Sequence, residues 1–184
     1  MLLQRLLVVV LCFGVTAPAW AVRPNFNYLG AGYARQQLDV GCDQDGLYLE
    51  ANMALNEIVY ANAHHLDVTS DSFCGVTSTA LSLGFRADMS RSSVLYGQAT
   101  MINRDYGPDS DAGFGATLGA RGIVAPAMEL RGFVTYEAID DIRETIMGIG
   151  LNFWFSRAFS LNGDISTSDE NNEAVSLGLR FNFF

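Results

Sequence analysis

The side chains best suited to acid–base or nucleophilic chemistry fall in one short stretch of the sequence. His64, His65 and Asp67 are followed by Ser70 and Ser72, and serine hydrolases combine a histidine with a carboxylate and a serine. The stretch therefore leaves open a protease or a lipid A-modifying enzyme. If it forms a strand, adjacent residues point to opposite faces, so the two imidazoles do not readily share a metal ion. We expect ordinary histidines, no metal site and no enzyme, and keep the enzyme as an alternative.

Two further patterns resemble ligand sites. Residues 30–35 (GAGYAR) begin like a dinucleotide-binding fingerprint, but they lack its third glycine and no helix pattern follows. We therefore expect no cofactor. Acidic residues also gather between the apolar segments, yet the sequence contains no twelve-residue calcium loop. A solvated acidic rim is the expectation, and a divalent cation bridging to lipopolysaccharide is the alternative.

The composition excludes one class of partner. The 184 residues carry a net charge of −9, and all 11 basic residues are arginine. Nucleic-acid binding requires the opposite sign of charge, so we expect no nucleic-acid partner. Hydrophobic residues make up 49% of the chain and charged residues only 17%, which is apolar for an exported globular protein.

The first 21 residues have the three parts of a secretory signal. Arg5 supplies a positive charge, residues 6–15 form an apolar stretch, and Ala19-Trp20-Ala21 matches a small-x-small cleavage site. Residues 1–21 are therefore predicted to be a cleaved signal peptide, and residues 22–184 a single domain. Export of this kind predicts a location outside the cytoplasm.

From residue 26 onward, apolar and polar residues alternate in segments separated by short polar connections. Most segments have about 9–12 residues, the length that a tilted strand needs to cross a bilayer. This pattern predicts an all-β protein, a transmembrane antiparallel up-and-down β-barrel with short periplasmic turns and longer acidic outer loops. Eight strands are the alternative to ten, because the ninth segment is the weakest. The ten predicted strands are 26–38, 46–55, 58–68, 76–88, 93–104, 113–124, 128–138, 145–155, 159–167 and 173–184.

The polar face of these segments separates a membrane barrel from a soluble β-sandwich, which also alternates. That face holds glycine, serine, asparagine and isolated charges, but no lysine, which suits a crowded lumen better than an open surface. Parity and strand direction also turn Phe133 and Trp154 inward. The predicted charge cluster of the lumen is Glu50, Arg86, Arg121, Glu129, Arg131 and Arg180.

Two cysteines remain after the signal peptide, Cys42 and Cys74. Both fall in predicted outer loops of neighbouring hairpins, and export allows disulfides to form. We therefore predict a disulfide between them, which would stabilise the fold by about 3–4 kcal/mol on chain-entropy grounds.

Three stretches carry a resemblance to a known family. They are residues 27–33 (NYLGAGY), 81–86 (LSLGFR) and 178–183 (GLRFNF). With them, the chain resembles the small, single-domain, porin-like outer-membrane β-barrel proteins of Gram-negative bacteria. The resemblance implies an outer-membrane location and contact with membrane lipid, lipopolysaccharide and the barrel assembly machinery. It also implies that the terminal aromatic residues Phe181, Phe183 and Phe184 act as the assembly signal.

The function expected from these patterns is structural or surface-interacting. Eight strands leave an interior that side chains just fill, and ten strands with inward arginines and aromatics predict a largely plugged lumen. An extracellular ligand or a host surface is the expected external partner. A narrow pore for small solutes is the first alternative, and the enzyme at the barrel rim is the second.

Overall fold

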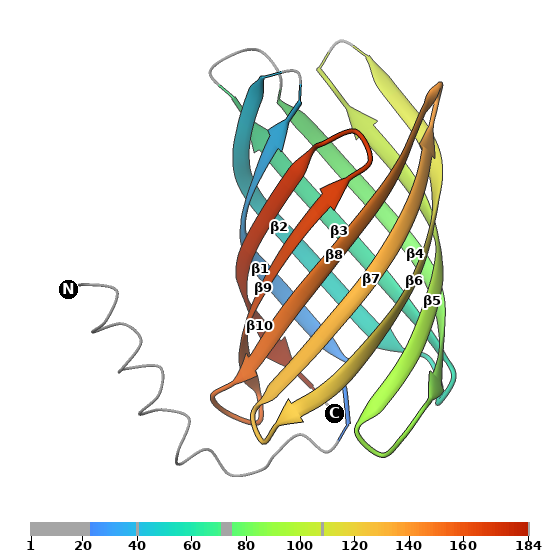
Figure 1. Ribbon diagram of the computed structural model, residues 1–184, viewed down its shortest axis with the longest axis vertical. Coiled ribbons are helices and arrows are strands. Elements are labelled where there is room, and N and C mark those ends of the chain that lie inside the picture. Colours follow the sequence, from blue (N-terminus) through green and yellow to red (C-terminus); the bar gives the residue numbers. More distant parts are fainter. Residues whose placement is uncertain (1–22, 40, 71–74, 108, 184) are drawn as a thin grey trace, which may run out of the picture.

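The computed structural model describes residues 23–39, 41–70, 75–107 and 109–183. These residues form ten antiparallel strands that close into a barrel, with β10 paired to β1 (Figure 1). The predicted fold class and its ten strands are confirmed. Within the described residues, no helix is long and apolar enough to cross a membrane. The strands are β1 (Tyr28–Leu38), β2 (Cys42–Ala54), β3 (Val59–Thr69), β4 (Val76–Asp88), β5 (Ser93–Asp105), β6 (Ser110–Ala125), β7 (Met128–Ile139), β8 (Ile142–Trp154), β9 (Phe159–Ser168) and β10 (Glu173–Asn182).

The two ends of the barrel differ. We call the end where β1 starts and β10 stops the periplasmic end, and the opposite end the outer end. At the outer end the strands run further than the sequence predicts. β2 begins at Cys42, and β7 and β8 are joined by Asp140 and Asp141 alone, with Asp140 at a φ of 50°. Acidic residues there continue the ladder, as in the Gln37–Asp43 pair, because backbone pairing does not depend on side-chain polarity. The outer connections are therefore shorter than expected.

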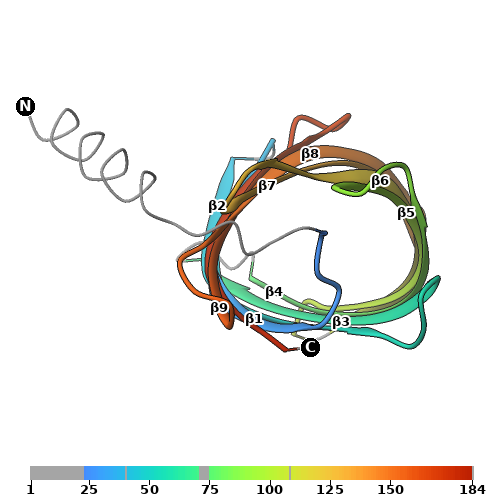
Figure 2. The same ribbon diagram turned by 90° about the horizontal axis from the view of Figure 1, so that it is seen from below.

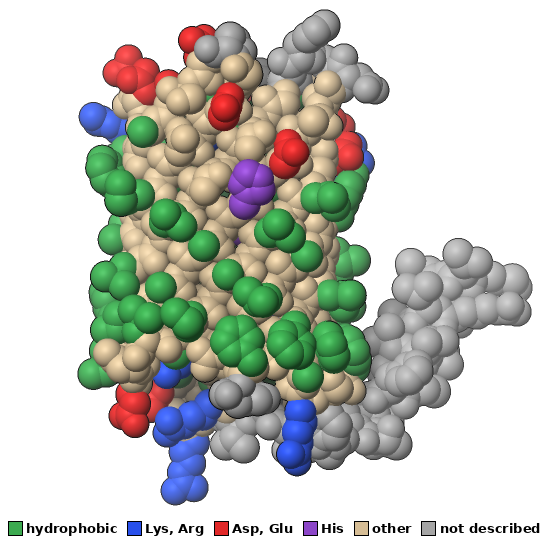
Figure 3. Space-filling model, turned by 180° about the vertical axis from the view of Figure 1, so that it is seen from behind, with side chains coloured by type: hydrophobic (Ala, Val, Ile, Leu, Met, Phe, Trp, Pro, Cys, Tyr) green, Lys and Arg blue, Asp and Glu red, His purple; other side chains and the backbone are tan. Residues whose placement is uncertain are grey.

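The exterior of the barrel is apolar. Large hydrophobic side chains recur at alternate positions, and Leu47, Phe114 and Leu118 are each more than two-thirds exposed. Figure 3 shows hydrophobic side chains spread over one side of the wall, with acidic side chains mostly at the outer rim and basic side chains mostly at the periplasmic end. A continuous apolar surface of this kind requires a nonaqueous surrounding, and it is the exterior that spans a bilayer in membrane barrels.

A row of aromatic side chains lines the periplasmic end of the wall. Phe155 stacks on Phe159 with ring centroids 6.4 Å apart, and Phe159 contacts Phe181 at 5.4 Å. Phe181 in turn contacts Phe183 at 6.4 Å. Such rows form the interfacial girdles of membrane barrels. The last predicted member of the assembly signal, Phe184, lies outside the described residues.

The first strand starts two residues later than predicted. The sequence assigns residues 26 and 27 to a strand, but β1 begins at Tyr28. Residues 23–27, which we call the N-terminal segment, instead run from the wall into the periplasmic mouth of the barrel (Figure 2). Phe26 is buried there, at 2% exposure, because the barrel interior offers the ring an aromatic site.

Candidate functional site

The lumen is lined by the residues that face inward from alternate positions of each strand. Its aromatic side chains lie on inward glycines of neighbouring strands. Tyr60 is directly opposite Gly84, and a Cβ on Gly84 would lie 2.2 Å from the Tyr60 Cζ atom. The other aromatic–glycine pairs are Tyr96 with Gly119, Phe133 with Gly148, and Tyr48 with Gly32. The glycines let the rings lie against the wall, because no side chain of their own occupies that space.

Three ion pairs occupy the periplasmic half of the lumen. The pairs, with their N–O distances, are Arg121–Glu129 at 2.5 Å, Arg131–Asp164 at 2.8 Å and Arg180–Glu50 at 3.1 Å. Arg121, Glu129 and Arg180 are each at most 5% exposed. Buried charges are costly unless they are paired and hydrogen-bonded, so each arginine is held by its carboxylate. Tyr28 adds a hydrogen bond of 2.7 Å from its hydroxyl to Glu50 Oε1.

Two of these pairs reach across an intervening strand. Gly150 on β8 is directly opposite both Arg131 on β7 and Asp164 on β9. A Cβ on Gly150 would collide with the Asp164 carboxylate. Likewise, Gly30 on β1 is directly opposite both Arg180 on β10 and Glu50 on β2. Inward glycines therefore allow ion pairs between strands that are not neighbours.

The structure places the six predicted lumen charges, Glu50, Arg86, Arg121, Glu129, Arg131 and Arg180, around this half of the barrel. Five of them belong to the three ion pairs. Arg86 lies at the mouth, where its Nε donates to the Glu57 carbonyl at 2.9 Å and its guanidinium covers the Phe26 ring. The sequence analysis missed Asp164, although its alternation with Ser160 and Asn162 in β9 would have placed it inside.

A further ion pair lies nearer the outer end. Arg104 Nη2 contacts Glu137 Oε2 at 2.5 Å, and both side chains are partly exposed to the lumen. Glu144, which is directly opposite Glu137 in the β7–β8 register, accepts a hydrogen bond of 2.7 Å from Asn172 Nδ2. These residues were not predicted from the sequence as lumen charges, and the predicted strands leave Glu144 in the connection between residues 138 and 145.

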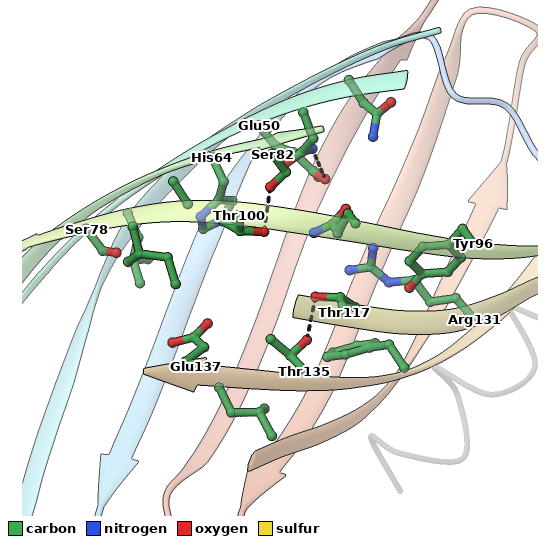
Figure 4. Close-up of a pocket in the computed structure, with 18 of the residues that line it drawn as sticks. Glu50, His64, Ser78, Ser82, Tyr96, Thr100, Thr117, Arg131, Thr135 and Glu137 are labelled. Carbon is green, nitrogen blue, oxygen red and sulfur yellow. Dashed lines mark hydrogen bonds between the residues drawn. The ribbon is translucent and has the colours of Figure 1, made fainter. Parts of the chain in front are cut away.

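A cavity of about 320 Å³ occupies the lumen above the ion pairs. Phe26 and Tyr60 are among the residues that line it. Figure 4 shows Glu50, His64 and Arg131 around this space. A cavity of about 600 Å³ continues from it to the outer connections of the strands. The periplasmic half of the lumen is thus crowded, and its outer half is hollow.

Hydroxyl groups line the middle of this cavity. Ser82 and Thr100 are 2.9 Å apart, and Thr117 and Thr135 form a second pair at 2.9 Å (Figure 4). In both pairs either oxygen can donate, so each hydroxyl can also turn its donor or acceptor toward a molecule in the lumen. Because the nearby charges are largely paired with one another, the wall is suited to small, polar, uncharged groups.

The histidines and the aspartate of the catalytic hypothesis point to opposite faces of the barrel wall. His64 faces the lumen, where it stacks on Tyr48 with centroids 5.8 Å apart. His65 faces outward and contacts the Thr79 hydroxyl at 2.9 Å, and outward-facing Asp67 accepts a hydrogen bond from Thr77. Ser72 lies outside the described residues. Within the described part of the chain, no group of three or more His, Cys, Asp or Glu side chains is placed to hold a metal ion.

The predicted disulfide involves one residue that the structure describes. Cys42 is buried at the start of β2. It lies three residues before Asp45, which pairs with Thr69, the last residue of β3. Cys74 lies outside the described residues, so the Cys42–Cys74 bridge stays a prediction. We expect that alkylation of the denatured, unreduced protein labels neither cysteine, whereas the reduced protein is labelled at both. Two labelled cysteines without reduction would contradict it.

Comparison with known proteins gives a likeness of fold. No family model and no curated protein sequence matches the chain. Among solved structures, "KdgM porin in complex with disordered oligogalacturonate" has a TM-score of 0.54 at 7% identity, and covers 85% of this chain and 99% of that one. A second structure, "KdgM porin", has a TM-score of 0.53 at 8% identity, with 84% and 99% covered. The chain therefore has the fold of a porin-like outer-membrane β-barrel.

Proposed function

We propose that the protein is an integral outer-membrane barrel with a structural or surface-interaction role and a lumen closed at its periplasmic end. The observation that carries this proposal is the buried layer of paired charges across the periplasmic half of the lumen. Its Arg121–Glu129 and Arg180–Glu50 pairs have three members at most 5% exposed. Breaking such a pair leaves a charge buried without a partner, so the layer resists opening by thermal motion alone.

The proposed location and partners follow from the apolar exterior of the barrel. Its exposed leucines and phenylalanines would contact membrane lipid, and lipopolysaccharide would surround the outer rim. We further propose export by the predicted signal peptide into a Gram-negative envelope, and recognition of Phe181 and Phe183 by the barrel assembly machinery. An extracellular ligand or host surface would meet the outer connections. The separation of His64 from Asp67 by the wall supports a role other than catalysis.

A narrow pore for small solutes is the second candidate. The cavities of about 320 and 600 Å³ favour it, because together they provide a polar path from the outer end to the middle of the lumen. The likeness in fold to a protein described as a porin also supports this candidate. Conduction by this path requires the periplasmic half of the lumen to open.

Planar-bilayer recordings of the processed, folded protein in KCl test the closed lumen. We expect bilayers containing the protein to show no steady large channels, because paired charges and aromatic side chains occupy the narrow half. Heat-modifiable mobility in SDS gels, checked on the same sample, shows that the barrel is folded. Bilayers with detergent alone provide the background. Frequent, large and stable conductance steps from the folded protein would show that the lumen is open.

A further inference from the structure

We propose that the periplasmic mouth of the barrel is a binding site for the chain's own N-terminal segment, residues 23–27, and that this segment is the gate of the lumen. The inference rests on the proposed closed lumen: the layer of paired charges narrows the periplasmic half, and the N-terminal segment closes the passage that this layer leaves. The segment lies in the mouth, inside the ring of strands (Figure 2). It is not part of the barrel wall, since β1 begins only at Tyr28.

The main occupant of the site is the side chain of Phe26. Two guanidinium groups contact the Phe26 ring, with Arg86 Cζ at 4.8 Å and Arg121 Cζ at 4.5 Å from its centroid. The ring also lies near Tyr60, at 4.8 Å, and Tyr96, at 6.5 Å between centroids, in a buried cluster that includes Val94. Cations over the faces of an aromatic ring attract it, more strongly where water is excluded. The mouth is thus suited to an aromatic side chain.

Phe26 also separates the lumen cavity from the periplasmic side. The ring lines the cavity of about 320 Å³ from below, while the ring itself is only 2% exposed. Residues of β3 and β5 surround it as a cluster of Tyr60, Val94 and Tyr96. Without the ring, the cavity would extend toward the mouth.

The attachment of the segment is uneven along its length. Asn27 is fixed at the wall, because its side chain accepts a hydrogen bond from the Ala54 amide at 2.8 Å and its carbonyl accepts one from the Phe183 amide at 3.0 Å. Further from the wall, the Asn25 carbonyl accepts a hydrogen bond of 3.0 Å from Arg121. Arg23 forms only an exposed ion pair with Asp88 at 3.4 Å, and exposed pairs of this kind contribute little.

This arrangement suits a hinge at Asn27 with Phe26 as the stopper. Local opening of a short segment outside the sheet costs less than separating strands, so the stopper can leave while the barrel stays closed on itself. With signal cleavage after Ala21, as the sequence predicts, the segment would be a free end able to swing out of the mouth. The two arginines that hold the ring would then line the opened passage.

Planar-bilayer conductance in KCl of the processed full-length chain tests the gate. The variant is Phe26→Ala, and the matched control is Phe85→Ala. This control removes an equal ring from the exterior of the barrel, where Phe85 is 58% exposed. We expect Phe26→Ala to raise the conductance or the frequency of openings at least several-fold. Phe85→Ala should behave like the unmutated protein.

The outcomes separate this inference from the proposed function. If folded Phe26→Ala is as silent as the unmutated protein, the gate is wrong and the closed lumen stands. If the unmutated protein already forms large channels, the closed lumen itself is wrong. Should Phe26→Ala fail to show heat-modifiable mobility, Phe26→Leu takes its place. Leucine keeps most of the apolar volume but loses both cation–ring contacts, so it should open more often than the unmutated protein, and equal silence would overturn the gate.

Discussion

Replacing Glu129 with leucine is expected to destabilise the folded barrel by about 3–5 kcal/mol, the usual cost of leaving a buried charge without its partner. Glu129 is 1% exposed, and its Oε1 atom accepts the 2.5 Å hydrogen bond from Arg121 Nε. Leucine has a similar size, so the change removes the carboxylate without leaving a large cavity. Arg121 is 5% exposed and would keep its positive charge in the crowded half of the lumen. Urea unfolding of the protein in lipid vesicles, followed by tryptophan fluorescence, measures the change.

Two further variants show that the effect comes from the unpaired charge. The double change Arg121→Met with Glu129→Leu removes both charges and should recover most of the lost stability, because apolar residues can replace a buried ion pair. Asp43→Ala breaks the exposed Arg35–Asp43 pair, which has a distance of 2.7 Å. It should cost at most about 1 kcal/mol. A single Glu129→Leu variant as stable as the Asp43→Ala variant would contradict the assignment of a buried pair.

Gly84→Ala is expected to destabilise the barrel by about 1–3 kcal/mol, the cost of inserting a methyl group into a packed interior. The added Cβ would lie 2.2 Å from Tyr60 Cζ and 2.6 Å from its hydroxyl oxygen. The Tyr60 ring is 1% exposed and packs on Phe26 at 4.8 Å. To accommodate the methyl group, the Tyr60 ring would have to shift from its packing position on Phe26. Chemical unfolding in vesicles again provides the measurement.

The matched control is Gly132→Ala, on the outer face of β7. A Cβ at Gly132 would have no heavy atom within 4 Å, so the change adds no clash. Alanine also loses less conformational entropy than glycine on folding, and Gly132→Ala should be neutral or slightly stabilising. Equal losses at Gly84 and Gly132 would show that a general requirement for glycine in the strands, and not the Tyr60 contact, sets the cost.

The sequence alone determined the architecture and the two faces of the wall. Side chains alternate with a period of two along a strand, so the sequence of each strand indicates which side chains face lipid and which face the lumen. This alternation predicted ten strands and turned Phe133 and Trp154 inward, as they are in the structure. The strand ends were less accurate, because acidic residues such as Asp43 pair in the ladder as readily as apolar ones.

Only the tertiary structure decided which inward side chains meet. Arg131 and Asp164 come from β7 and β9, and they meet because Gly150 on β8 leaves room between them. Phe26 was predicted to extend the first strand, yet it turns into the mouth and contacts Arg86 and Arg121. Local alternation cannot predict such contacts, since they depend on strand register, on closure of the sheet and on groups far apart in the chain. The direction of each side chain is a local property, whereas its partner across the lumen is set by the closed barrel.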